Sequence, residues 1–217
     1  MKRSLHILFI GLDALVIAFV TLSATTNLFT VNSVLWNSGL WKFRYFTVDS
    51  NVLAALAVLA AMPFKFRRLI NGKPLPSWCA VFCFVGVTAS TVTFMTVMLF
   101  LGPNLGYYNM FLGNNMLLHL ICPVCMALSF IFDFGAEKKL KIAYTPLSIL
   151  LTAVYAVLYF IMVLGIGLEN DGWEDFYGFN MGGMWYLSGV TMFLTTYGIG
   201  VFLWASHRVS EKWEKSV

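Results

Sequence analysis

Two side chains in separate apolar stretches, a threonine and a histidine, have the types needed for nucleophilic catalysis. Thr47 follows an aromatic pair near the start of the second apolar stretch, and His119 lies within the fourth. A threonine hydroxyl is a weak nucleophile unless a base within about 2.6–3.2 Å accepts its proton during attack. We therefore take Thr47 as a candidate nucleophile and His119 as a candidate base.

Polar residues near Thr47 and His119 are candidates for holding a substrate or an oxyanion. At 100° per residue, Thr47, Ser50 and Asn51 share one face of a helix, which small residues continue at Ala54, Ala57, Val58 and Ala61. This stripe is compatible with close helix packing and with a pocket wall. We assign Ser50, Asn51 and Asn115 as oxyanion candidates, with Trp185 and Ser188 of the last apolar stretch as further substrate-binding candidates.

His119 is followed by a proline at a spacing that disturbs a helix. Pro123 has no N–H, so the carbonyl of His119 loses its helical partner, and we expect a kink and a donor from a neighbouring helix. Asn115 lies one turn before His119 and is the side chain we expect to orient the imidazole ring. A purely structural histidine that bonds another helix is the alternative.

Two carboxyl groups also lie inside apolar stretches, where ionisable residues are costly and are functional candidates by default. Asp13 and Asp49 are therefore a possible ion or proton site. For Asp13 the alternative is a hydrogen bond to a hydroxyl of another helix. For Asp49 the alternatives are a helix cap or a pair with Arg44.

The four cysteines and the acidic stretch carry weaker signals. Cys122 and Cys125 have the spacing of a redox or metal pair, but they lie inside an apolar run, and with Cys79 and Cys83 we interpret them as buried inert thiols. A four-thiol metal site is the alternative. The acidic stretch 169–175 matches no calcium-loop spacing, and we expect it to be solvated. We expect neither a metal nor a cofactor.

Composition places the whole chain in a membrane. Of its 217 residues, 59% are hydrophobic and 11% are charged, and the mean hydropathy is +0.79. Soluble domains carry about 25% charged residues. We predict one domain over residues 1–217, an all-α integral membrane protein built as a bundle of six transmembrane helices. The spans are expected near 5–28, 44–63, 78–101, 111–132, 142–166 and 184–206.

The distribution of basic residues predicts the orientation. The N-terminus, the second and fourth loops and the C-terminus hold 12 of the 14 Lys and Arg residues, Lys65 among them, and the remaining segments hold only Lys42 and Arg44. Positive residues favour the cytoplasmic side, so both termini are predicted to be cytoplasmic. Trp36, Trp41, Tyr107, Tyr108, Trp173 and Trp185 are expected to form an aromatic belt at the outer ends. The net charge of +4 reports this topology and gives no reason to expect nucleic acid.

The segment from Phe43 to Leu53, together with His119 and Pro123, resembles a known family. It is similar to the six-pass family of androgen-induced and androgen-dependent TFPI-regulating membrane hydrolases, above all to their small prokaryotic relatives, which share an aromatic-Phe-Thr-x-x-Ser-Asn pattern and a later histidine. This resemblance implies that Thr47 is the nucleophile and His119 the base of an intramembrane threonine hydrolase. It also implies esters of fatty acids with hydroxy fatty acids as substrates, membrane lipids as partners, and a prokaryotic plasma membrane as location.

Two other functions remain open from the sequence. A small transporter would use Asp13, Asp49 and His119 as proton or ion sites, although the halves of the chain show no repeat. A lipid-binding membrane protein without turnover would use the same pocket only for packing and recognition. The three readings differ in which substitution matters most: Thr47 for a hydrolase, Asp13 and Asp49 for a transporter.

Overall fold

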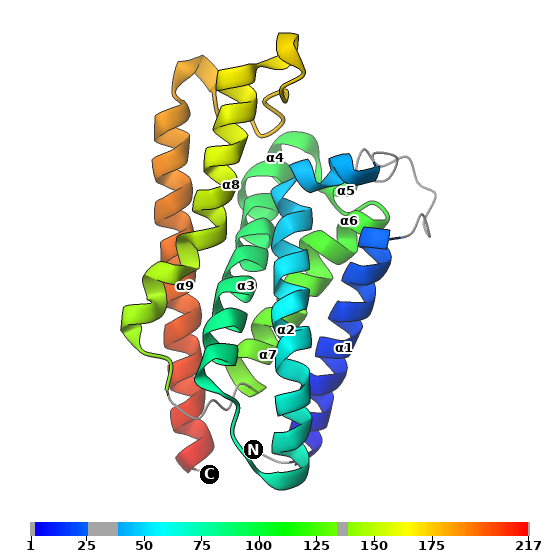
Figure 1. Cartoon of the computed structure of the whole chain (residues 1–217), viewed down its shortest axis with the longest axis vertical. Coiled ribbons are helices and arrows are strands. Elements are labelled where there is room, and N and C mark those ends of the chain that lie inside the picture. The colour runs from blue at the N-terminus through cyan, green and yellow to red at the C-terminus, as the bar shows by residue number, and fades with distance from the viewer. Residues whose placement is uncertain (1–2, 26–38, 134–138, 217) are drawn as a thin grey trace.

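The computed structural model describes residues 3–25, 39–133 and 139–216, and it folds them into a bundle of helices (Figure 1). Six helices of the described residues are long and apolar enough to cross a membrane, over Arg3–Ser23, Phe46–Asn71, Ser77–Leu105, Asn114–Phe132, Ile142–Ile166 and Trp185–Lys212. The prediction of an all-α, multi-pass membrane protein is thereby confirmed. Residues 26–28 of the first expected span lie outside the described residues.

Several of the six spans are built from more than one helical segment. α1 is Arg3–Thr25, α2 is Phe46–Asn71 and α9 is Trp185–Ser216. The third span joins α3 (Ser77–Thr96), the π-helix η2 (Val97–Leu101) and α4 (Gly102–Leu105). The fourth span joins α6 (Asn114–Met116), the π-helix η3 (Leu117–Ile121) and α7 (Cys122–Asp133). The fifth span joins η4 (Ile142–Ile149), α8 (Leu150–Phe160) and the π-helix η5 (Ile161–Ile166). Short helices lie between spans: η1 (Gly39–Arg44), α5 (Tyr107–Met110), η6 (Leu168–Asn170) and η7 (Met181–Gly183).

The second span is longer than the sequence predicted. It was expected to end at Pro63, but α2 runs through this proline to Asn71, and Gly72 then adopts a left-handed conformation with φ of +66°. The N–H of Gly72 bonds the carbonyl of Arg68, which is a common way to end a helix. The apolar run ends at Pro63 while the helix continues, so hydropathy alone placed this boundary too early.

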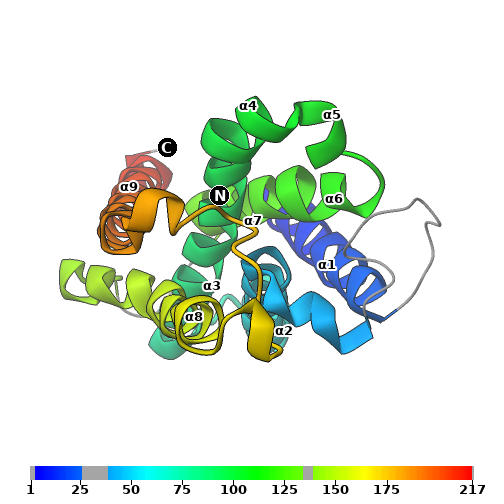
Figure 2. The same cartoon turned by 90° about the horizontal axis from the view of Figure 1, so that it is seen from above.

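α3 lies at the centre of the bundle and packs against α2, α7 and α9, while α1 covers α2 and α7 from outside (Figures 1 and 2). The small residues expected to form a stripe on α2 are buried there, Ala54 and Ala61 completely. A Cβ atom on Gly86 of α3 would lie 2.8 Å from the Cα of Ala54, so glycine is what allows the two backbones to approach so closely.

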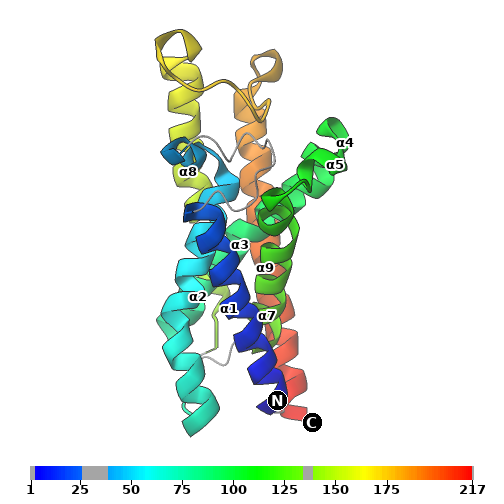
Figure 3. The same ribbon diagram turned by 90° about the vertical axis from the view of Figure 1, so that its right-hand side faces the viewer.

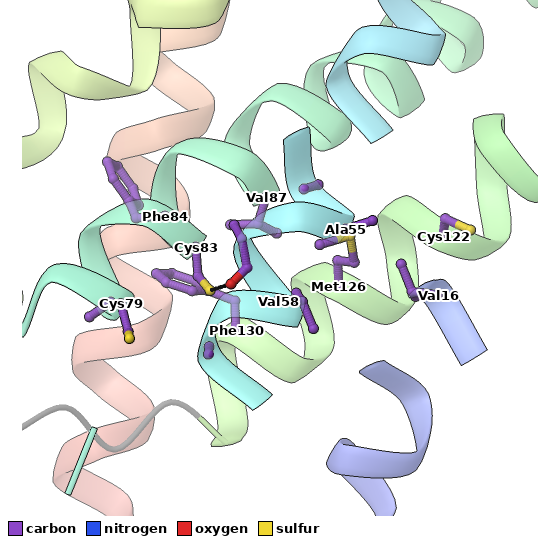
Figure 4. Close-up of a cluster of buried hydrophobic side chains, with 14 of the residues drawn as sticks. Val16, Ala55, Val58, Cys79, Cys83, Phe84, Val87, Cys122, Met126 and Phe130 are labelled. Carbon is purple, nitrogen blue, oxygen red and sulfur yellow. Dashed lines mark hydrogen bonds between the residues drawn. The ribbon is translucent and has the colours of Figure 1, made fainter. Parts of the chain in front are cut away.

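The cysteines are part of this packing (Figure 4). All four thiols are free, and the thiol of Cys83 donates a hydrogen bond to the carbonyl of Ala57 at 3.4 Å. Cys122 lies well away from Cys79 and Cys83 in Figure 4. In the described part of the chain, no three His, Cys, Asp or Glu side chains are grouped closely enough to hold a metal ion.

α1 begins and α9 ends at one end of the bundle, and α2 begins at the opposite end (Figures 1 and 3). Thr47, in the first turn of α2, therefore lies far from both termini. The cytoplasmic assignment of the termini rests on the Lys and Arg distribution and stays a prediction.

A buried ion pair joins three helices near the terminal end of the bundle. Lys65 of α2 donates hydrogen bonds to the carboxylate of Asp13 in α1 and, at 3.1 Å, to the hydroxyl of Ser129 in α7. Lys65 is 3% exposed, so its assignment to a solvated loop was wrong. The expected hydroxyl partner of Asp13 was wrong too, because the Ser129 hydroxyl bonds the ammonium group instead. A lysine just beyond a predicted span end was counted as a loop charge, although its helix continues.

We expect Lys65→Met to lower the free energy of unfolding by about 3–5 kcal/mol, because it leaves the Asp13 carboxylate buried without its cation. The double variant Asp13→Leu/Lys65→Met should lose less than Lys65→Met alone. Reversible denaturation in detergent would measure both, with the exposed Lys73→Met as control, expected to stay within about 0.5 kcal/mol of wild type. A double variant less stable than either single one would contradict this account of the pair.

Candidate active site

Thr47 and His119 meet between α2 and the fourth span. The Oγ1 atom of Thr47 lies 3.5 Å from Nε2 of His119, and both side chains are buried. This separation is at the long end of a hydrogen bond, and such contacts in unliganded enzymes often tighten when substrate binds. The tertiary fold thus brings together two residues that are 72 positions apart in the chain.

The second nitrogen of His119 decides which proton the ring carries. Nδ1 lies 2.7 Å from the carbonyl oxygen of Met110 in α5. A carbonyl only accepts hydrogen bonds, so in the neutral ring Nδ1 must carry the hydrogen and donate it. Nε2 then has a lone pair directed at the hydroxyl of Thr47. This is the tautomer that a general base for Thr47 requires.

The turn before α6 brings Met110 to the histidine, in place of the asparagine expected there. Gly113 has φ of +59°, a value that favours glycine, and reverses the chain between α5 and α6. The amide of Asn115 reaches the carbonyl of Asn109 at 3.5 Å and does not contact His119. The expectation that Asn115 orients the imidazole was therefore wrong, because a backbone carbonyl of the preceding turn has that position.

Asn51 ties α2 to the π-helical turn that holds His119. Its Nδ2 group donates to the carbonyl of Thr47 at 2.8 Å and to the carbonyl of Leu118 at 3.0 Å. In a π-helix the carbonyl of residue i bonds the N–H of residue i+5. For Leu118 that residue is Pro123, which has no N–H, so the Leu118 carbonyl has no partner within its own helix. The sequence predicted a carbonyl in need of a donor but placed it at His119. The π-helix moves that requirement one residue back, and Asn51 meets it.

The other polar candidates have structural partners. The hydroxyl of Ser50 contacts the Thr93 hydroxyl of α3 at 2.8 Å and the carbonyl of Thr47 at 3.2 Å. Both amide hydrogens of Asn51 are directed at backbone carbonyls, and the amide of Asn115 donates to the Asn109 carbonyl. Ser50 and Asn51 thus hold the helices together, and none of the three lines the pocket beside Thr47.

Thr47 also forms part of the wall of a pocket, and His119 does not. The pocket lies between α2, α3 and the last two spans, and the space between its lining atoms, including the part that is open to the outside, is about 560 Å³. Its wall is mostly apolar, with hydroxyl groups from threonines and tyrosines. The lining residues are Phe46, Thr47, Thr93, Thr96, Val97, Leu101, Thr152, Tyr155, Ala156, Tyr159, Phe160, Tyr177, Phe179, Gly189 and Met192.

Trp185 and Ser188 do not line this pocket. The helix α9 contributes Gly189 and Met192 instead, and the ring of Trp185 packs edge-on against Phe160 with 43% of the residue exposed. Helical periodicity placed the right helix beside the pocket. It could not give the rotation of α9 about its own axis, which packing against α3 and η4 sets.

The connecting loop, residues 167–184, crosses from the fifth span to α9 (Figure 2), and its residues Tyr177 and Phe179 line the pocket. The carboxylate of Asp175 accepts hydrogen bonds from the N–H groups of Phe179 (2.9 Å) and Asn180 (2.7 Å) and from the hydroxyl of Tyr159 (2.7 Å). Trp173 is 8% exposed and packs on Tyr159. Glu169, Asp171 and Glu174 are exposed, as expected of a solvated loop, but Asp175 and Trp173 fold inward, so the Trp173 ring is buried among protein side chains.

Tyr177 of the connecting loop reaches Thr47 itself. Its hydroxyl oxygen accepts a hydrogen bond from the N–H of Phe46 at 3.1 Å and interacts with the side chains of Thr47 and Tyr155. Burial is the main cause that raises the pKa of Tyr177 above its ordinary value. The hydroxyl is therefore protonated at neutral and moderately alkaline pH.

The two carboxyl candidates do not join this site. Asp13 contacts Lys65, which follows Thr47 by 18 residues and so lies about 27 Å further along α2. Asp49 is partly buried, and within the described residues its carboxyl group has no hydrogen bond or ion pair, either with Arg44 or as a helix cap. Asp13, Asp49 and His119 consequently form no continuous chain of polar contacts in the described structure.

Sequence reasoning missed Met110, Tyr177 and Lys65. Nothing in the sequence distinguishes the Met110 carbonyl, because a backbone acceptor has no residue signature. Tyr177 lies in a loop rich in acidic and aromatic residues, and only the fold of that loop directs it to Thr47. For Lys65 a signal existed in the helical spacing. If α2 continues beyond Pro63, Lys65 lies on the same face as the buried residues Ala54, Val58 and Ala61, while Arg67 points to another side.

Comparisons of this chain with protein-family models, with curated proteins and with solved structures found no match. The resemblance of the segment around Thr47 to the androgen-induced hydrolases stays a prediction from short motifs.

We expect Asn51→Leu to lower the free energy of unfolding by about 1–3 kcal/mol, because the Leu118 carbonyl becomes a buried acceptor without a donor. A matched control is Asn104→Leu, since exposed Asn104 donates only to the carbonyl of Phe100 in its own helix, at 2.7 Å. Chemical denaturation of both variants in detergent would make the comparison. Equal effects at the two positions would refute the role assigned to Asn51.

Proposed function

We propose that this protein is an intramembrane hydrolase of lipid esters, with Thr47 as nucleophile and His119 as general base. The observation that carries the proposal is the arrangement of His119: Nδ1 is fixed as a donor by the Met110 carbonyl, and Nε2 is directed at the Thr47 hydroxyl. The same logic operates in hydrolases where an acidic residue fixes the histidine and a serine attacks. A backbone carbonyl here has the place of the acid.

The reaction balances without any further reactant except water. The Thr47 oxygen attacks the ester carbonyl while His119 Nε2 takes the hydroxyl proton, and a tetrahedral intermediate forms. Its collapse breaks the bond to the alcohol oxygen, which leaves with the proton from His119. Water then attacks the acyl-threonine, gives a proton to His119, and releases the fatty acid as the proton returns to Thr47.

The substrate class follows from the pocket and its place in the bundle. The wall on the reactive side of Thr47 is mostly apolar and lies among membrane-spanning helices, which suits an acyl chain better than a polar metabolite. Esters of fatty acids with hydroxy fatty acids, the substrates implied by the resemblance around Thr47, belong to this class. The lipid would reach the pocket laterally from the membrane.

The transporter reading has less support than the hydrolase. Two of its three ionisable groups have separate partners, Lys65 for Asp13 and Thr47 for His119, and the Asp49 carboxyl is bonded to neither pair. A lipid-binding protein without turnover would use the same pocket, but it would not need an imidazole lone pair directed at a hydroxyl. The experiment below distinguishes these possibilities.

We expect a fluorophosphonate probe to label the purified protein in detergent and to fail on Thr47→Ala, because the probe reacts with an activated hydroxyl. Thr47→Ser keeps a hydroxyl and should retain labelling. Thr91→Ala is the control, since Thr91 bonds the carbonyl of Val87 in its own helix and lies outside the pocket. Labelling detected by gel fluorescence, with the labelled residue mapped by mass spectrometry, gives the readout.

His119→Ala should reduce the labelling rate by about 100-fold or more, because the proton of Thr47 then has no acceptor. The control is His207→Ala, because His207 is also buried with Nδ1 near a backbone carbonyl, that of Phe130 at 3.0 Å, yet lies beside Glu211 and no hydroxyl. Equal losses in the two histidine variants would point to damaged folding. Labelling of folded Thr47→Ala at the wild-type rate would overturn the proposed function.

A further inference from the structure

An ester hydrolase needs a hydrogen-bond donor for the oxyanion that forms in the transition state. His119 is not part of the pocket wall that Thr47 lines, so a donor to a substrate held in the pocket belongs to that wall. Ser50, Asn51 and Asn115 have other partners, as described above. The question is therefore which hydroxyl of the wall lies at Thr47 with a proton available.

The three tyrosines of the wall differ in where their protons go. The hydroxyl of Tyr159 donates to the carboxylate of Asp175 at 2.7 Å, and that of Tyr155 donates to the carbonyl of Arg44 at 2.6 Å. The oxygen of Tyr177 instead accepts the Phe46 N–H, so its own proton is directed elsewhere. The side chains of Thr47 and Tyr155 lie next to this oxygen, and among the described residues its proton is given to no carbonyl or carboxylate.

The connecting loop holds this hydroxyl in place before any substrate binds. Asp175 fixes the turn through the N–H groups of Phe179 and Asn180, and the backbone N–H of Tyr177 donates to the Tyr159 hydroxyl at 3.2 Å. The Tyr177 ring packs on Phe176 and Phe179, with centroids 4.7 and 5.3 Å away. A donor fixed in advance, in a site with little water, stabilises developing charge without reorganising.

We propose that Tyr177 is the oxyanion donor of the Thr47 site, contributed by the connecting loop that lines part of the pocket. When Thr47 attacks, the negative charge forms on the former carbonyl oxygen within the pocket, and the Tyr177 hydroxyl donates a hydrogen bond to it. The phenol keeps its proton throughout, and only hydrogen bonds are exchanged. This inference rests on the proposed hydrolase function.

We expect Tyr177→Phe to reduce kcat for hydrolysis of 4-nitrophenyl octanoate by about 100-fold or more while KM changes little, because only the transition state carries the oxyanion. Tyr107→Phe is the control. Tyr107 also lies outside the spans and donates to a carbonyl, that of Met98 at 2.7 Å, but it is not part of the pocket wall. Melting temperatures of both variants would show whether they fold.

A second substitution keeps the hydroxyl and the shape of the loop. Incorporation of 3,5-difluorotyrosine at position 177 lowers the pKa of the phenol, so activity should persist at neutral pH and be lost at a lower alkaline pH than in wild type. A merely structural tyrosine would leave this alkaline limit unchanged. The difluoro variant therefore decides the matter if Tyr177→Phe does not fold.

The outcomes separate the two proposals. If hydrolysis depends on Thr47 but folded Tyr177→Phe keeps wild-type kcat, or the alkaline limit does not move, Tyr177 is not the oxyanion donor and the hydrolase function stands. If wild type shows no Thr47-dependent hydrolysis or labelling, both proposals fall. A kcat loss confined to Tyr177→Phe, with KM and Tyr107→Phe near wild type, supports them together.

Discussion

The amide of Asn51, which donates to the carbonyls of Thr47 and Leu118, is the contact on which the rest of the site depends. Inside a membrane a carbonyl without a donor is costly, and the π-helical turn before Pro123 creates one at Leu118. A single side chain meets this requirement and at the same time fixes the first turn of α2 against the turn that holds His119. The spacing of Thr47 and His119 is therefore set by backbone hydrogen bonding.

The surrounding structure turns this contact into a site with two distinct sides. On one side, the turn at Gly113 brings the Met110 carbonyl to Nδ1 of His119 and so fixes the tautomer. On the other side, Asp175 folds the connecting loop over an apolar pocket and brings Tyr177 to Thr47. Thr47 thus belongs both to the contact with His119 and to the wall of the pocket.

The remaining buried charges are separated from this site and serve the bundle. Lys65 and Asp13 join α1 to α2 about 27 Å from Thr47, where they fix the relative positions of the outer helix and the core. Gly86 and the small residues of α2 allow α3 to approach closely. This close contact between α2 and α3 also holds Ser50 against Thr93, next to Thr47.

The sequence alone determined the membrane class, the six spans and the two residues worth testing, because hydropathy over about 20 residues and the rarity of polar groups in such runs are local properties. It could not place Met110, Tyr177 or Lys65 correctly. The Met110 acceptor is a backbone carbonyl, which has no sequence signature. The position of Tyr177 depends on the fold of its loop, which bonds Tyr159 in a distant helix. Lys65 is buried only because α2 continues beyond the predicted end of its span. Which nitrogen of His119 faces Thr47, and which hydroxyl faces the pocket, only the tertiary structure decided, because both depend on hydrogen bonds between segments far apart in the chain.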